Sequence, residues 1–129
     1  MRIDIKEGSD QLSSVIIGAA IEVHRHLGPG LLENTYERAL IFELEQKGLE
    51  LKSQEAVPVI YKGHSLGTEY KLDLLVNDLV IVELKAVEKV LPIHKAQLLT
   101  YLKLKKRWLG LLINFNAPVL KQGVVRVVN

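Results

Sequence analysis

The chain has 129 residues, of which 48% are hydrophobic and 25% charged, a composition typical of a folded domain and not of a disordered segment. It contains no cysteine, which excludes disulfide bonds and thiolate metal sites. The net charge is only +2, yet residues 1–84 hold 8 basic and 14 acidic residues, whereas residues 85–129 hold 9 basic residues and one acidic residue. A basic half of this kind indicates a polyanion-binding surface, a charge-complementary fold or a homodimer.

The first half of the chain begins with two predicted helices. The first runs from Ser9 or Asp10 to the LGPG stretch at residues 27–30, where glycine and proline end it. Its apolar stripe consists of Leu12, Ile16, Ala19, Ala20, Val23 and Leu27. The second runs from about Leu31 to Lys47 and stops at Gly48. Glu33 falls on the apolar face of this helix, where an unpaired carboxylate is costly to bury.

Strands dominate the second half. Residues 54–61, 66–76 and 79–87 have strand character and are separated by turns at 62–64 and 77–78, which predicts an antiparallel meander. Pro58 indicates that the first of these strands lies at an edge. Pro92 then begins a helix that runs to about Lys106, and strands follow at 108–115 and 124–128. Sequentially paired strands followed by a crossover helix predict one α/β domain over residues 1–129, with a mixed sheet flanked by helices.

The stretch VIVELKAVE at residues 80–88 places two charges inside the most strand-like segment. Glu83 and Lys85 lie two residues apart, so in a strand they share one face. They could be a neutralised pair on the exposed side of an edge strand. The turn at 77–78, however, also brings Asp73 opposite Val82 or Glu83. Two carboxylates suit a hard divalent ion such as Mg²⁺, and a nearby lysine can orient a water or neutralise charge on a phosphate.

These residues form part of a longer pattern. The order Asp73–x9–Glu83–Leu84–Lys85 resembles the PD-(D/E)xK nuclease superfamily. Residues 30–36, GLLENTY, read as the G-x-x-E-x-x-Y signature of its small GxxExxY family. The surrounding stretches IGAAIEVHRHLGPGLLE, VPVIYKG, HKAQLLTYL and GLLINF are similar as well, so the resemblance covers roughly residues 10–128. It implies a restriction-endonuclease-like αβββαβ core.

The resemblance also implies roles for individual residues. Mg²⁺ or Mn²⁺ would be held by Glu33, Asp73, Glu83 and the backbone carbonyl of Leu84. The catalytic set would be Asp73, Glu83, Lys85, Gln97 and Tyr101. From position alone, Glu33 could instead satisfy free N–H groups at the start of its helix. Gln97 and Tyr101 could likewise belong to a polar strip that faces solvent.

Supporting and substrate-contacting roles are further hypotheses. Tyr36 is expected to pack and hydrogen-bond near Glu33, and His24 either to cap a helix end or to support the site. Trp108 is expected in the core. The bases that could hold a nucleic-acid backbone are Lys89, Lys95, Lys103, Lys105, Lys106 and Arg107. The last four could equally be the ordinary basic end of a helix.

Two functions are compatible with these residues. The first is a metal-dependent nuclease that acts on nucleic acid, DNA before RNA; the second is a non-catalytic module of the same fold that binds nucleic acid or protein. A homodimer is compatible with both. The chain has no apolar run of the roughly 18 residues that a membrane helix needs, and MRIDIKEGSDQ lacks the apolar core of a signal peptide. We therefore expect a cytoplasmic protein without membrane contact.

Overall fold

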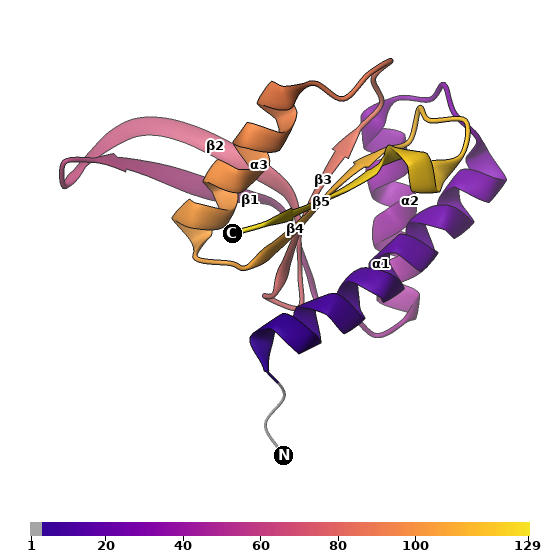
Figure 1. Cartoon of the computed structure of the whole chain (residues 1–129), viewed down its shortest axis with the longest axis horizontal. Helices are drawn as coiled ribbons and strands as arrows, with labels where there is room; N and C mark the ends of the chain where they lie inside the picture. Colours follow the sequence, from indigo (N-terminus) through magenta and orange to yellow (C-terminus); the bar gives the residue numbers. More distant parts are fainter. Residues whose placement is uncertain (1–3) are drawn as a thin grey trace.

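The computed structural model describes residues 4–129, except for the side chains of residues 68 and 69. The elements follow the expected order of two helices, three strands, a helix and two strands (Figure 1). Their bounds are α1 Ile5–Leu27, α2 Glu33–Gln46, β1 Leu51–Tyr61, β2 His64–Val76, β3 Val80–Lys85, α3 Pro92–Lys105, β4 Leu109–Asn114, the 3₁₀ turn η1 Leu120–Gly123 and β5 Val124–Val128.

The five strands form one mixed sheet in the order β1-β2-β3-β4-β5. β1, β2 and β3 pair antiparallel, β3 and β4 pair parallel across the α3 crossover, and β5 returns antiparallel to β4. The predicted mixed sheet with flanking helices is therefore confirmed, and β1 with Pro58 does lie at an edge. The strand that carries Glu83 and Lys85 is the central one, so it is not the exposed edge strand of the alternative interpretation.

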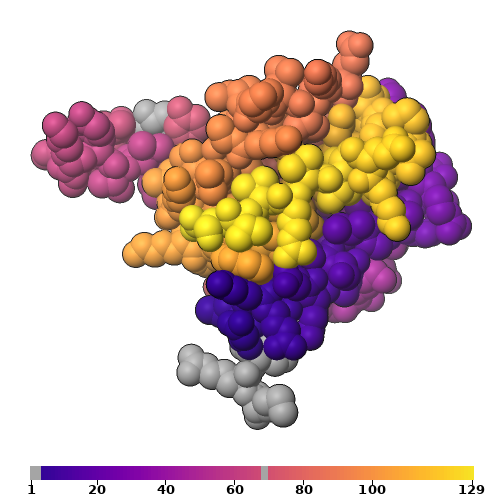
Figure 2. Space-filling model, in the orientation of Figure 1, coloured from indigo at the N-terminus to yellow at the C-terminus, as the bar shows by residue number. Residues whose placement is uncertain are grey.

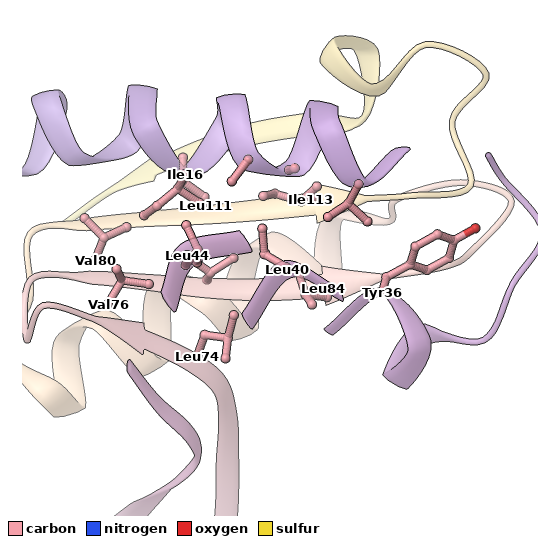
Figure 3. Close-up of a cluster of buried hydrophobic side chains, with 14 of the residues drawn as sticks. Ile16, Tyr36, Leu40, Leu44, Leu74, Val76, Val80, Leu84, Leu111 and Ile113 are labelled. Carbon is pink, nitrogen blue, oxygen red and sulfur yellow. The ribbon is translucent and has the colours of Figure 1, made fainter. Parts of the chain in front are cut away.

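Helices cover both faces of the sheet (Figure 1). α1 and α2 pack on one face, where their apolar side chains meet alternate residues of β3 and β4 (Figure 3). α3 packs on the other face, against Leu72, Leu75 and Ile81. A Cβ on Gly110 of β4 would lie 2.8 Å from a methyl of Leu98, so glycine there lets α3 approach the sheet closely. Within residues 4–129, none of the helices combines the length and the apolar character needed to cross a membrane.

Several element bounds differ from the sequence expectation: β1 begins at Leu51 and not at residue 54, β2 at His64 and not at residue 66, and α2 at Glu33 and not at Leu31. α1 begins at Ile5, about one turn earlier than expected, and its last stripe residue, Leu27, is 39% exposed and lies outside the core. Trp108 is half-buried and precedes β4. β3 ends at Lys85 and not at Val87, because the buried Asn114 side chain accepts from the Val87 N–H and donates to its carbonyl. These two side-chain bonds replace the backbone ladder and turn the chain out of the sheet.

Tyr36 holds the loop that joins α1 to α2. Its ring stacks on Phe115 at 4.6 Å between centroids, and its hydroxyl donates to the Gly28 carbonyl at 2.5 Å. The same hydroxyl accepts from the Leu31 N–H at 3.0 Å. Gly30, inside this loop, has φ +97°, which an L side chain rarely adopts. The G-x-x-E-x-x-Y spacing thus has a structural explanation: glycine allows the turn, tyrosine fastens it, and Glu33 lies at the start of α2.

We predict that Tyr36→Phe lowers the free energy of unfolding by about 1–3 kcal/mol, because the ring contact with Phe115 is kept while two backbone groups lose their partner. Urea denaturation would measure the loss. Tyr61→Phe, on an exposed tyrosine, should change stability by less than about 0.5 kcal/mol. Equal effects of the two variants would contradict the role assigned to the Tyr36 hydroxyl.

Candidate active site

The site forms where β2 separates from β3. Leu72 faces α3, whereas Leu74 faces α1 and α2, although residues two apart in a strand normally share a face. The pleat of β2 therefore reverses at Asp73. Gln54, the residue that would pair with Asp73 on β1, has φ +54° and is missing from the ladder between Ser53–Leu74 and Glu55–Leu72. This irregularity frees the Asp73 side chain from both faces of the sheet.

Asp73 forms two hydrogen bonds with β3 through its side chain and its N–H. Its Oδ2 accepts from the Leu84 N–H at 2.8 Å, and its own N–H donates to Glu83 Oε1 at 3.3 Å. The expected proximity of Asp73 and Glu83 is thus observed. Glu83 is only 6% exposed. Burial, and next the charge of Asp73, raise the pKa of Glu83 from 4.5 to about 9.

Lys85 and Glu33 lie near this carboxylate pair. The Lys85 ammonium acts to lower the pKa of both Glu83 and Glu33, so its charge is felt at both carboxylates. Yet in the part of the chain that the structure describes, none of the ion pairs includes Lys85. Much of the Glu33 residue is exposed, but partial burial of its carboxyl group and the charge of Asp73 raise its pKa. Glu83 and Lys85 are therefore not a closed structural ion pair.

α3 approaches the carboxylates from the opposite face to α2. Tyr101 is 5% exposed and packs among Leu72, Ile81 and Leu98. Burial, and then the charges of Glu83, Asp73 and Tyr70, raise the pKa of Tyr101. Gln97 lies one turn earlier, is exposed, and lines a hollow together with Tyr101. Tyr101 is therefore a buried neighbour of the carboxylate pair and not part of a solvent-facing strip.

His24 and Tyr36, the two expected supporting residues, act on the loops. His24 Nε2 lies 2.8 Å from the Ala117 carbonyl and so links α1 to the segment after β4. Tyr36 fastens the loop before Glu33. Among the residues described, no hydrogen bond joins either side chain to Glu33, Asp73 or Glu83. Their contribution is to position α1 and α2 around the site.

The basic residues between Lys85 and Arg107 do not form one patch. α3 crosses back between the parallel strands β3 and β4, so its first turn lies at the end of β3 near Lys85, and its last turn lies at the other end of the sheet. Lys89 and Lys95 are exposed at the first end. At the last turn of α3 and just after it, Lys105 pairs with Glu55 at 3.6 Å and Arg107 with Asp78 at 2.6 Å. Lys103 belongs to the same last turn, and Lys106 caps it.

The oxygen donors of the site fit a hard divalent cation. Burial, and next the charge of Asp73, raise the pKa of Glu83, and a bound cation would favour the charged form of both carboxylates. The Leu84 carbonyl belongs to the same strand segment. Across residues 4–67 and 70–129, however, no three His, Cys, Asp or Glu side chains are gathered closely enough to hold a metal ion. The three-carboxylate set with Glu33 remains a prediction.

A family comparison agrees with this geometry. The model of the PD-(D/E)XK nuclease superfamily matches residues 10–127. The chain belongs to this superfamily. No curated protein and no solved structure matches it. The match includes α2, α3, the strands β1 to β4 and all but the last residue of β5 in the PD-(D/E)XK sheet.

Two residues of the PD-(D/E)XK site were missed by sequence reasoning. Gln54 Nε2 donates to Glu37 Oε1 on α2 at 2.9 Å and to Asp73 Oδ1 at 3.3 Å, so it connects the second helix to the carboxylate pair. No spacing rule indicates this role, since Gln54 and Glu37 are separated by a helix end and a loop. A polar residue at the end of a buried strand could have pointed to Asn114, which shapes the exit of the chain after Lys85.

The buried carboxylate predicts how stability depends on pH. A carboxyl whose pKa is raised on folding binds more protons in the folded state, so the metal-free protein should lose stability as pH rises from about 4.5 to about 9. The slope should approach about 1.4 kcal/mol per pH unit, and Glu33, shifted in the same direction, adds to it. Urea denaturation in a chelator between pH 5 and 9 would measure the slope.

Glu83→Gln removes the titrating group and should flatten this slope, leaving the variant more stable than the wild type at pH 8. Glu88→Gln, at an exposed glutamate five residues on, serves as the control and should keep the wild-type slope. A stability that is flat with pH in the wild type, or equally steep in Glu83→Gln, would show that Glu83 is already charged in the folded protein.

Proposed function

We propose that this domain is a nuclease of the GxxExxY family that hydrolyses phosphodiester bonds of nucleic acid. The observation that supports it most is the hydrogen bond between the half-buried Asp73 and the buried Glu83, beside Lys85 at the end of the central strand. A structural core gains nothing from such a pair, because burying a carboxylate against a second carboxylate is costly. Because this arrangement costs folding free energy, we infer that the two carboxylates serve to bind a ligand, such as a cation.

Each residue of the site has a separate role in this proposal. Asp73, Glu83 and the Leu84 carbonyl would hold Mg²⁺ or Mn²⁺, with Glu33 completing the set from α2. When bound, the cation supplies a Lewis acid for the phosphate and makes an attacking water more acidic. Lys85 presents a positive charge on the same strand face as Glu83, where it can orient that water or stabilise negative charge on the phosphate. Gln97 and Tyr101 approach from α3 and can hold a non-bridging oxygen or the lysine.

Rigidity explains why these groups lie on β3. The strand is paired on both sides along its first residues, and its Leu84 N–H is held by Asp73. Reacting groups must keep their positions to within a fraction of an ångström, and a central strand meets that requirement better than a loop. The cost of crowding the carboxylates is met by packing on both faces of the sheet.

We predict that Lys85→Ala lowers the rate of Mg²⁺- or Mn²⁺-dependent cleavage about 100-fold or more, because charge stabilisation in the transition state is lost. Glu83→Gln should lower it at least as far and also remove any rise in melting temperature caused by the cation. A panel of single- and double-stranded DNA and RNA would be incubated with each protein. Lys121→Ala, at an exposed lysine after β4, should cleave like the wild type. Binding without cleavage in every arm would favour the non-catalytic nucleic-acid-binding module.

We also predict which lysines contact the nucleic-acid backbone. Lys89→Ala and Lys95→Ala should weaken binding and each reduce the slope of log affinity against log salt by about 0.7–0.9, the contribution of one phosphate contact. Lys105→Ala should leave the slope unchanged, since Lys105 pairs with Glu55 at the other end of α3. Filter binding at several salt concentrations would give the slopes. A larger change for Lys105→Ala than for Lys95→Ala would place the nucleic-acid backbone at the last turn of α3 and not at its first.

A further inference from the structure

The distal parts of β1 and β2 form a projecting hairpin beside α3. We call residues 55–72, beyond the pleat reversal at Gln54 and Asp73, the arm. It extends well past the body of the protein (Figure 2), and α3 crosses its inner part (Figure 1). Lys105 of α3 pairs with Glu55 at the base of the arm, at 3.6 Å, which holds the two elements together there. Between them lies a groove of about 400 Å³.

Apolar and aromatic side chains line this groove. The arm contributes Val59, Leu66 and Tyr70, and α3 contributes Leu104 together with Gln97 and Tyr101. Tyr70 is 43% exposed and Leu66 is 51% exposed, so large apolar surfaces face the groove. A concave, mainly apolar hollow of this size with a few polar groups is typical of a ligand site. Its polar groups are a carboxamide, two phenol hydroxyls and the hydroxyl of Thr100, which donates to the Ala96 carbonyl of the same helix.

The groove continues into the candidate active site. Tyr101 lines the groove and also packs against Leu72 and Ile81, which stand next to Asp73 and two residues before Glu83. Gln97, which we assign to the catalytic set, lies in the groove wall. Burial, and then the charges of Glu83, Asp73 and Tyr70, raise the pKa of Tyr101, which agrees with its position between the groove and the carboxylates. A phosphate at the carboxylates would therefore have its neighbouring nucleoside at the mouth of the groove.

We propose that the groove binds one unpaired base of the substrate strand, adjacent to the phosphate that is cut, with the base stacked on Tyr70. The inference rests on the proposed nuclease function and specifies its substrate. Every base has a π-face, so stacking on tyrosine tolerates any sequence, while the Gln97 amide can bond a base edge. A base within a duplex must first be unpaired and unstacked to enter, which costs free energy. The preferred substrate is therefore single-stranded nucleic acid or a frayed strand end.

The test measures binding separately from cleavage. The Lys85→Ala protein would be titrated in Mg²⁺ with short single strands of DNA and of RNA that carry 2-aminopurine, whose fluorescence falls on stacking. We expect quenching with both strands, and binding about tenfold weaker when the fluorescent base is replaced by an abasic site. The duplex of the same sequence should bind more weakly than the single strand at equal salt. These binding measurements need no substitution in the groove.

Variants of the arm then locate the base. Tyr70→Ala should weaken single-strand binding about tenfold and abolish quenching, whereas Tyr70→Phe should keep both. The matched control is Tyr61→Ala, an exposed tyrosine of the same arm that lies under Lys62 and does not line the groove. It should bind as the parent does. Circular dichroism and melting temperature would verify that each variant is folded.

Three results would overturn the inference: abasic and normal strands that bind alike, a duplex that binds as tightly as the single strand, or equal losses from Tyr70→Ala and Tyr61→Ala. Failure of the nuclease proposal looks different. Wild-type protein that never cleaves these strands, while Tyr70-dependent quenching persists, would remove catalysis and keep the base site. Cleavage without Tyr70-dependent quenching would keep catalysis and remove the base site.

Discussion

The hydrogen bond from the Leu84 N–H to the Asp73 carboxylate determines much of the rest of this structure. In an ordinary antiparallel pair, a backbone carbonyl of β2 would accept from β3. Here a side chain does so, because the pleat of β2 reverses at Asp73. The ladder between β2 and β3 therefore stops at Leu74–Val82, and the two strands separate beyond it. Glu83 and Lys85 lie where they separate, on a strand still held by β4 on its other side.

The same reversal involves both helical layers. Gln54, opposite Asp73, bonds Glu37 on α2, while Leu72, just before Asp73, packs under Tyr101 on α3. A change at this one irregular step of the sheet would thus be transmitted to the helix on either face. The pleat reversal also affects the arm: beyond it, a residue two positions along β2 faces the opposite side of the sheet, as Leu72 and Leu74 do. Local irregularities of this kind are common next to active sites, where they aim a side chain that a regular strand would leave in the core or in solvent.

Much of this could be predicted from local pattern. The short apolar runs around Ile81 and Leu111 predict buried strands. Because a helix connects them, the two strands are expected to pair parallel. The proximity of Asp73 and Glu83 follows from the short turn at residues 77–79 between the antiparallel strands β2 and β3. The position of the Lys103–Arg107 run could not be predicted by counting charges along the chain, since a crossover helix carries its last turn to the opposite end of the sheet. Gln54 was equally hidden, because only the folded chain brings its side chain to Glu37 and Asp73.

The outer edge of the arm is β1, and this edge strand is poorly suited to pair with a strand of another chain. Pro58 has no N–H to donate there, and the register shift between Pro58 and Ile60 interrupts the row of backbone groups that a foreign strand would need. Exposed Ile60, Tyr61 and Leu66 would otherwise make this hairpin a template for aggregation. The proline and the bulge thus allow the protein to keep apolar side chains in water, available to a small planar ligand, without the strands of neighbouring molecules adding to the sheet.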